Sequence, residues 1–257
     1  VVAPSGSSVF MGGDFALVGG VPRDNLAAID IATGQVTGWA PGTDAPVASI
    51  TAAGGKVYGA GGFSSPRAGI AALDRNSGVA NGWPQGISGS ISSMQVVEGR
   101  LWVCGQFSSL LGVTRSGIAE VDTSSGVPLA FDAHAVGGVR SIAVTNSIVY
   151  AGGGFFQIGG FARAGLAALS TSSGVATAWD PTRPNTQIGS VALDGSVLYV
   201  AGGFDSIGVV PEARRGLAGI DVTTGLATAF QADVTGGTAG VMTSTGGELY
   251  LAGPFTG

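Results

Sequence analysis

The chain alternates between short apolar runs and turns rich in glycine, proline, asparagine and aspartate. Residues 186–235 show the pattern in full, with apolar runs at 186–194, 197–204, 216–221 and 226–230. Short apolar runs bounded by turn residues are typical of antiparallel strands. No segment carries an apolar stripe with a period of 3.6 residues over three turns, which a surface helix would need. The pattern therefore predicts an all-β fold with essentially no helix.

The four-run pattern recurs along the whole chain. One run of each copy ends in Gly-x-Phe or Gly-Phe, and the intervals between these phenylalanines are 48, 44, 48, 49 and 51 residues, for Phe15, Phe63, Phe107, Phe155, Phe204 and Phe255. Four strands per repeat of this length are typical of a β-propeller blade. We therefore predict a β-propeller of four-stranded antiparallel blades, with about 48 residues per blade.

The repeats divide residues 1–257 into five complete blades and half of a sixth, all in one β-propeller domain. With strands A to D counted from the axis outward, blade one has its strands at 1–3, 9–15, 25–30 and 35–39, whereas the half-blade has strand A near 239–243 and strand B at 248–255. Since an unpaired sheet edge is a liability, we expect a six-bladed ring whose missing strands belong to a longer parent chain. A piece of a seven- or eight-bladed ring is the alternative. The predicted blades are 1–45, 46–86, 87–136, 137–185, 186–235 and 236–257.

Composition narrows the classes of partner. Glycine makes up 47 of 257 residues but does not occur at every third position, which excludes collagen, and 45% hydrophobic residues argue against disorder. The net charge of −5 and the absence of a basic cluster disfavour nucleic acid and anionic membranes. The uncharged run 141–162 matches the repeat and contains Asn146 and Gln157, so we expect no membrane insertion. A leader, if the protein has one, is expected upstream of Val1.

Four positions recur in the C–D region of every complete blade. An arginine starts strand C, an aspartate or serine follows seven residues later, a glycine four residues after that, and an aromatic residue five further on. The arginines are Arg23, Arg67, Arg115, Arg163 and Arg214; the second set is Asp30, Asp74, Asp122, Ser170 and Asp221; the glycines are Gly34, Gly78, Gly126, Gly174 and Gly225; the aromatics are Trp39, Trp83, Phe131, Trp179 and Phe230.

The recurring aspartate is either a metal ligand or a turn residue. Its side chain can accept backbone N–H bonds two or three residues on, and the glycine supplies the positive φ that closes the hairpin. Ser170 can make the same local bond but would be a poor calcium ligand, and the spacing lacks the alternating acids of a calcium loop. We assign the set to the turn and predict no metal site.

The recurring arginine has a structural and a functional interpretation. Hairpin geometry puts Arg23 diagonally across from Trp39, and Arg163 near Trp179, where each guanidinium could stack on the ring. Alternatively, the five guanidinium groups form a ring on the face that carries the B–C and D–A loops, where they would bind carboxylates or anionic sugars. Both interpretations remain open at this point.

Catalytic candidates are few. His134 is the one histidine, which excludes a histidine-rich metal site, and no spacing supports a serine–histidine–carboxylate set. Cys104 occupies the small position of strand B that Ala60 and Ala201 fill elsewhere, so we expect a buried apolar residue. Two loop carboxylates could converge as a glycosidase pair. The candidates are Asp14, Asp44, Asp180, Asp205 and Asp233.

The runs VGGVPRDNLAAIDIATGQVTGWAP, GGFARAGLAALSTSSGVATAWDP and VLYVAGGFDSIG resemble the repeats of bacterial secreted β-propellers of the delta-60, PQQ-like or Kelch-like type. The resemblance covers nearly the whole chain and implies export, commonly within a large surface or secreted protein. The repeat is also similar to the tryptophan-docking repeat of quinoprotein dehydrogenases, although four residues instead of three separate Gly34 from Trp39. The adjacent cysteines of those enzymes are missing, so we expect no cofactor.

These observations predict a non-enzymatic, extracellular or cell-surface module for ligand binding or structural display, with a glycan or protein ligand. The alternatives are a glycosidase or quinoprotein-like enzyme fragment, and a structural subunit of a surface assembly that exchanges strands with a missing segment or another chain. The candidate ligand-binding residues are Arg23, Arg67, Arg115, Arg163, Arg214, Asp180, Arg183 and Asp205.

Overall fold

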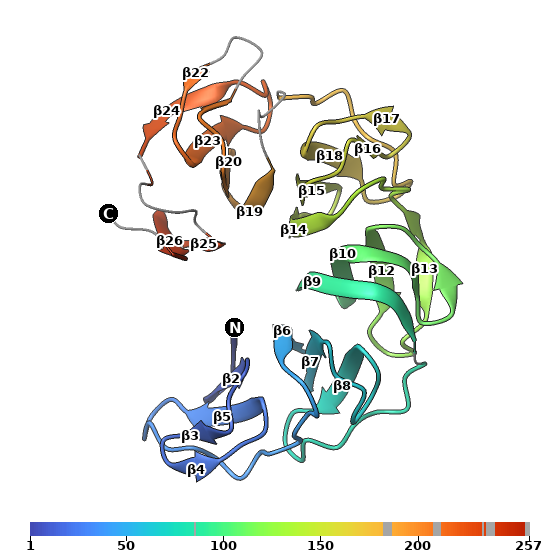
Figure 1. The fold of residues 1–257 in the computed structure, drawn as a ribbon, viewed down its shortest axis with the longest axis vertical. Helices are drawn as coiled ribbons and strands as arrows, with labels where there is room; N and C mark the ends of the chain where they lie inside the picture. The colour runs from blue at the N-terminus through green and yellow to red at the C-terminus, as the bar shows by residue number, and fades with distance from the viewer. Residues whose placement is uncertain (85, 182–186, 208–211, 233, 235–239, 255–257) are drawn as a thin grey trace. The chain divides into compact units, whose positions relative to one another are not determined.

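The structure is a computed structural model that describes residues 1–84, 86–181, 187–207, 212–232, 234 and 240–254 (Figure 1). All regular elements in these ranges are β-strands, so the predicted all-β fold is confirmed for them. None of these residues forms a helix long and apolar enough to cross a membrane. Arg183, Asp233 and Phe255 lie outside the described ranges.

Each of the five complete blades forms one antiparallel sheet in which strand B pairs with strand A on one side and with strand C on the other, and the half-blade forms a sheet of strands A and B. The first three sheets contain β1 (Val2–Ser5), β2 (Ser8–Gly12) and β5 (Leu26–Asp30); β6 (Val47–Ala53), β7 (Lys56–Gly61) and β8 (Ile70–Asp74); and β9 (Ile87–Val97), β10 (Arg100–Leu110), β12 (Ile118–Asp122) and β13 (Pro128–Asp132).

The remaining sheets repeat this order. They contain β14 (Val139–Val144), β15 (Ile148–Gly153) and β18 (Leu166–Ser170); β19 (Ile188–Asp194), β20 (Val197–Gly202), β23 (Leu217–Asp221) and β24 (Ala227–Gln231); and β25 (Val241–Thr245) and β26 (Glu248–Ala252). The last pair lies where strands A and B of the half-blade were predicted.

Short strands, which the sequence analysis did not predict, extend the loop between strands B and C. They are β3 (Leu17–Val18) with β4 (Val21–Pro22), β11 (Val113–Thr114) on β10, β16 (Gln157–Ile158) with β17 (Phe161–Ala162), and β21 (Ser206–Ile207) with β22 (Glu212–Ala213). We call each of these two-stranded loops a B–C hairpin.

The sheets group into two compact units. Unit 1 contains residues 1–115 and 119–129, and unit 2 contains residues 116–118 and 130–257. Within unit 1, strand β6 lies against both β1 and β9, so the A strands of blades one to three follow one another. Within unit 2, strand β19 lies in the same way against β14 and β25.

The prediction of four strands in every complete blade is wrong for three of the five. Blades three and five have a regular D strand, β13 and β24, whereas the D segments of blades one, two and four form one bridge each, Ile29–Val36, Leu73–Ala80 and Leu169–Ala176. The three irregular segments end in tryptophan, and the two regular strands contain Phe131 and Phe230 at the matching position. We attribute the difference to the indole ring, which reaches the next blade and draws the backbone out of the ladder.

This contact between blades involves the C–D turn. The indole Nε1 of Trp39 in blade one donates to the carbonyl oxygen of Asp74 in blade two at 3.1 Å. Trp179 in blade four donates in the same way to Asp221 in blade five at 3.3 Å. Both indoles also pack edge-on against an aromatic ring of strand B in their own blade, with centroids 4.9 Å from Phe10 and 5.4 Å from Tyr150.

The predicted turn role of the recurring aspartates is confirmed. The Oδ1 atom of Asp122 accepts the backbone N–H of Ser125 at 2.8 Å and the hydroxyl of the same residue at 2.8 Å. The turn glycine has a left-handed backbone, with φ of +73° at Gly126. Ser170 instead pairs its hydroxyl with Ser172 at 2.9 Å. The equivalent carboxylates in the other turns are Asp30, Asp74 and Asp221.

Glycines of strand B meet backbone or side chains of other strands. A Cβ atom at Gly61 would lie 2.2 Å from the carbonyl oxygen of Pro46, next to a bulge in strand A of the same blade. A Cβ atom at Gly12 would lie 2.6 Å from Val47, which belongs to strand A of the next blade. Small residues are therefore needed both within and between blades.

Replacing Trp39 by Phe should destabilise the fold more than replacing Trp83 by Phe. Both indoles are buried, with 5% and 6% of their surface exposed, but Nε1 of Trp83 has no hydrogen-bond partner among the described residues. The two changes remove the same ring volume, so the difference in unfolding free energy reports the bond to Asp74, about 0.5–1.5 kcal/mol. Urea titrations of the two variants measure it, and an equal or larger loss for Trp83→Phe would contradict the assignment.

The turn aspartates should make stability depend on pH in acid. Hydrogen bonds from Thr33, Ser77, Ser125 and Thr224 lower the pKa values of Asp30, Asp74, Asp122 and Asp221. A group with a lowered folded-state pKa contributes its stability above the unfolded-state pKa and loses it as the pH falls, here from about pH 4 downward.

The test compares urea midpoints between about pH 5 and pH 3. Asp122→Asn keeps an acceptor oxygen but does not titrate, so it should flatten the loss between these pH values. Ser170→Ala removes the corresponding hydroxyl of blade four and should leave the slope unchanged. A slope that is the same in wild type and Asp122→Asn would show that this turn does not carry the effect.

Candidate functional site

Four of the five recurring arginines bridge two backbone carbonyls of their own blade. Nη1 of Arg163 donates to the carbonyl oxygen of the preceding residue at 2.9 Å, and Nη2 donates to Thr177, fourteen residues on, at 2.9 Å. The same pair of bonds ties the start of strand C to the D segment in blades one, three and five. The other three arginines are Arg23, Arg115 and Arg214.

The predicted stacking of these arginines on the D-segment tryptophans is wrong. The guanidinium carbon of Arg163 lies 5.6 Å from the ring centroid of Phe161 in the B–C hairpin, while Trp179 packs on Tyr150. The side chain of Arg163 is 12% exposed and that of Arg214 is also 12% exposed. The structure thus gives four arginines a role in the fold, and their predicted role in ligand binding stays a prediction.

Arg67 differs from the other members of the set. It stands in the same repeat position of blade two but makes no hydrogen bond or ion pair among the described residues, and the residue fourteen positions on is Asn81. The amide nitrogen of Asn81 is buried without a hydrogen-bond partner in this part of the chain. Blade two therefore lacks the arginine bridge between two carbonyls, although its sequence has the recurring arginine.

Three of the candidate acids lie beside different partners. Asp180 pairs with Arg163 at 3.5 Å, and the backbone carbonyl of Asp205 accepts the N–H of Arg214 at 3.0 Å. Asp44 accepts the backbone N–H groups of Ser64 at 2.7 Å and Ser65 at 3.0 Å.

A further hydrogen bond, from the Ser64 hydroxyl, is the largest of the effects that lower the pKa of Asp44 to about 2. A carboxyl with this pKa is ionised at neutral pH and cannot act as a general acid.

Two further candidates from the sequence are Cys104 and His134. Cys104 is fully buried, and burial raises the pKa of its thiol, which confirms the expectation of a buried small residue. His134 is exposed, and its Nδ1 lies 3.6 Å from Oδ2 of Asp132. Among the residues that the structure describes, no three histidine, cysteine or acidic side chains lie close enough together to hold a metal ion.

The B–C hairpin of blade four, in unit 2, exposes large apolar side chains. Phe156 is 65% exposed, Phe161 is 50% exposed, and Val136 from the preceding D–A loop is 41% exposed. Backbone bonds join these segments, from Val136 to Gln157 at 2.8 Å and from Phe156 to Val136 at 3.0 Å. We call Val136, Phe156 and Phe161 the aromatic patch. The ion pair of Arg163 and Asp180 lies next to Phe161.

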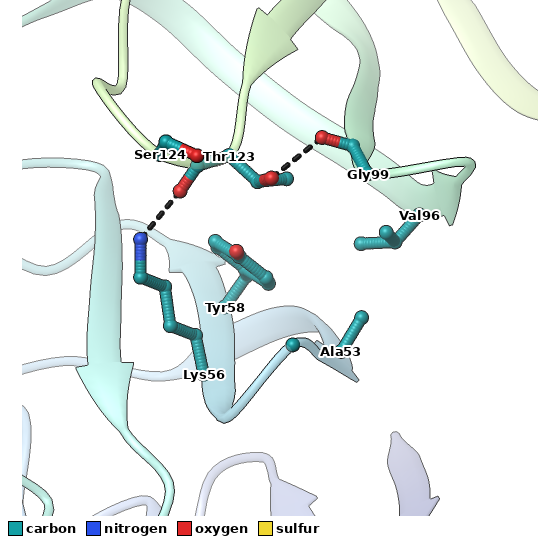
Figure 2. Close-up of a pocket in the computed structure, with 8 residues that line it drawn as sticks. Ala53, Lys56, Tyr58, Val96, Gly99, Thr123 and Ser124 are labelled. Carbon is teal, nitrogen blue, oxygen red and sulfur yellow. Dashed lines mark hydrogen bonds between the residues drawn. The ribbon is translucent and has the colours of Figure 1, made fainter.

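Unit 1 contains a pocket of about 370 Å³ between blades two and three, which we call the Lys56 groove (Figure 2). Lys56 reaches from the start of β7 to the C–D turn of blade three, where Nζ donates to the carbonyl oxygen of Thr123 at 2.5 Å. The hydroxyl of Thr123 donates in turn to Gly99 at 2.5 Å. The lining residues are Ala53, Gly54, Lys56, Tyr58, Val96, Gly99, Thr123 and Ser124.

A smaller pocket of about 270 Å³ occupies the equivalent place between blades one and two. Phe10 takes the position of Tyr58, and Arg75 and Asn76 take those of Thr123 and Ser124. Its cation comes from the turn rather than from strand B, and Nη1 of Arg75 donates to the Ser5 hydroxyl at 3.3 Å. The two neighbouring grooves of unit 1 are thus lined by residues at some of the same repeat positions but differ in their polar groups.

Sequence reasoning missed these grooves, although the repeat carries a signal for them. The third residue of strand B is aromatic in all six copies: Phe10, Tyr58, Trp102, Tyr150, Tyr199 and Tyr250. The residue two positions earlier is irregular, and lysine occurs there once, at Lys56, which is the sole lysine of the sequence. An aromatic residue in every copy, with a different residue two positions earlier in each copy, indicates a place where the polar groups differ between blades.

Comparison with solved structures gives the fold. The structure of U3-55K is similar with a TM-score of 0.64 and 13% sequence identity over 97% of this chain and 72% of that chain. The WD40 repeats of RRP9 are similar with a TM-score of 0.67 and 11% identity over 97% of this chain and 71% of that chain. The chain is therefore a β-propeller, and the number of blades in its closed ring stays a prediction.

No protein-family description matches the chain. No curated protein matches it either. At sequence identities of 11% and 13%, similarity to these structures shows the fold alone. The function therefore has to be inferred from the candidate sites.

Replacing Arg163 by Lys should destabilise the protein by roughly 1–2 kcal/mol, because an ammonium cannot bridge two carbonyls with the planar fork of a guanidinium. Arg67→Lys is the matched control, since Arg67 occupies the same repeat position without the bridge. We expect that control to stay within about 0.5 kcal/mol of wild type. Thermal and urea unfolding of both variants measure the effect, and equal losses would show that the bridge adds nothing.

Proposed function

We propose that this chain is a non-enzymatic, extracellular β-propeller module that binds a neutral glycan at the aromatic patch of blade four. The observation that carries the proposal is the exposure of Phe156 and Phe161 beside the ion pair of Arg163 and Asp180. The extracellular location rests on the resemblance of the repeats to those of secreted bacterial propellers.

The chemistry of the patch suits a sugar ring. An aromatic face packs against the C–H groups of a pyranose, while the ring hydroxyls need donors and acceptors at its edge. Phe161 supplies such a face, and the neighbouring ion pair supplies an acceptor through Asp180, whose side chain is 44% exposed, whereas that of Arg163 is 12% exposed. Because these two charges cancel, the surroundings favour a neutral sugar over an anionic one.

Blade one shows that the aromatic side chains are not needed for the hairpin itself. Its B–C hairpin has the same two-strand pairing, with Ala16 and Val21 at the positions of Phe156 and Phe161. The two phenylalanines therefore add exposed apolar surface that the equivalent fold does without. Large apolar side chains exposed together at one loop are typical of a binding site.

The glycosidase alternative has less support among the described carboxyls. Asp44 is ionised and held by three hydrogen bonds, and Glu120, whose pKa is raised by burial, pairs with Arg100 at 3.4 Å. A retaining or inverting enzyme needs two acids that face one cleft. We therefore propose binding without chemistry.

The test is a glycan array probed with the wild-type chain and with the double variant Phe156→Ala/Phe161→Val, which gives blade four the residues of blade one. We expect neutral oligosaccharides to bind the wild type, and the double variant to bind them at least about tenfold more weakly, as loss of two stacked rings predicts. Leu17→Ala, an equally exposed apolar change in the hairpin of blade one, should leave binding unchanged.

Two results would refute the proposal. One is an array without any neutral glycan bound by the wild type. The other is binding that the double variant retains in full, which would place the ligand elsewhere. If a protein instead binds at the aromatic patch and displaces the glycan, the ligand is a protein, which is the other partner class expected from the sequence.

A further inference from the structure

The Lys56 groove has the size and openness of a small-molecule site. Its volume of about 370 Å³ lies at the lower end of the range for ligand pockets, which is enough for one sugar ring or a small metabolite. Gly54, Gly99 and Ser124 at its mouth are exposed, whereas Tyr58 behind them is buried. A Cβ atom at Gly54 would meet nothing within 4 Å, so the turn leaves the entrance free.

The lining of the groove contains one positive charge and no negative one. Lys56 is the one ionisable cation among its lining residues, and none of those residues is an acid. This is notable in a chain with a net charge of −5, whose sole lysine is this one. The carboxylate of Asp122 accepts the backbone N–H groups of Ser124 and Ser125, and its negative charge contributes to the raised pKa of Tyr58.

The ammonium group has capacity for a ligand. It carries three N–H donors, of which one is directed to the carbonyl oxygen of Thr123 at 2.5 Å. Its Nζ atom lies over the ring of Trp83, 5.6 Å from the ring centroid. The donor is thus fixed in position before a ligand arrives, which reduces the ordering cost of binding.

Hydroxyl groups complete the lining. Burial raises the pKa of Tyr58 to about 12, so its side chain remains a neutral hydroxyl, and it is hydrogen-bonded to Thr123 at the back of the groove. Ser124 adds a second hydroxyl at the exposed mouth. A ligand that matches these groups has one anionic group and several hydroxyls.

We propose that the Lys56 groove binds a small carboxylate that also carries hydroxyl groups, of which a uronic acid is the simplest example. The carboxylate accepts hydrogen bonds from Lys56, and a hydroxyl of the ligand pairs with Ser124 at the exposed mouth. This site goes beyond the proposed function, since it lies in unit 1, differs in ligand charge and uses none of the residues of the aromatic patch.

The matched comparison is the equivalent groove between blades one and two. Its cation, Arg75, is bonded to Ser5, and its pocket is smaller at about 270 Å³. Arg75→Gln therefore removes a positive charge from the same face of unit 1 without touching the proposed site. It serves as the control for a general loss of charge.

The first experiment is isothermal titration of the wild-type chain with D-glucuronate, D-glucose and acetate. We expect glucuronate to bind, and glucose and acetate each to bind at least about tenfold more weakly, because one lacks the charge and the other lacks the hydroxyls. Lys56→Met and Ser124→Ala should both weaken glucuronate binding, whereas Arg75→Gln should leave it unchanged.

Because Lys56 also bridges two blades, a fold defect in Lys56→Met must be separated from a binding defect. Biosynthetic incorporation of lysine labelled with ¹³C at Cε gives one signal, from the one lysine of the sequence, and leaves its three N–H donors in place. The signal missing from Lys56→Arg identifies Lys56. We expect this signal to move on addition of glucuronate and to stay in place on addition of glucose.

The outcomes decide the proposal. A shift of the Lys56 signal with glucuronate, together with weaker binding by Ser124→Ala, supports it even if Lys56→Met unfolds. Equal affinity for glucose and glucuronate, an unmoved Lys56 signal at saturation, or no glucuronate binding would each overturn it. Failure of the glycan array at the aromatic patch would leave this result unaffected, since the two sites share no residue.

Discussion

The packing of one blade's C–D turn against the aromatic residue that ends the preceding blade's D segment is the constraint on which the structure depends. The carbonyl oxygen of Asp74 illustrates it, since it accepts both the N–H of Gly78 at 2.9 Å, which closes the turn, and the indole N–H of Trp39 at 3.1 Å. Closing the turn and fixing the neighbour are therefore one geometric requirement. A side chain in place of the turn glycine would interfere with both, because the backbone there has positive φ and faces the previous blade.

This constraint explains why the recurring residues tell so little about function. Aspartate, glycine, arginine and tryptophan recur because each holds a turn, a strand end or a neighbouring blade. The two sites that we propose lie instead where the copies differ, at Lys56 and in the hairpin with Phe156 and Phe161. A repeat protein of this kind separates residues that maintain the fold from those that distinguish one blade from the next.

The fold was predictable from the sequence because its determinants are local. The 48-residue spacing, the turn aspartates and the small position at Cys104 each reflect contacts within one blade or with its neighbour, and the structure confirms them. The irregular D segments were missed, because strand propensity does not show that an indole will leave the ladder for another blade. The bridge made by Arg163 was missed because its partner is a backbone carbonyl, which leaves no mark in the sequence.

The groove between blades two and three shows how a local departure from the pattern can create a site. Here the indole of Trp83 makes no bond to the next turn, and a Cβ atom at Gly126 would lie 2.5 Å from its ring, so the turn rests on the ring itself. Lys56 provides the link to the turn instead, through Thr123. An indole offers one donor, whereas an ammonium offers three and a full charge. Because the Lys56 ammonium makes this contact instead of the Trp83 indole, the two blades stay joined and N–H donors remain for a ligand. In this groove, contact between the blades and ligand binding therefore depend on the same side chain.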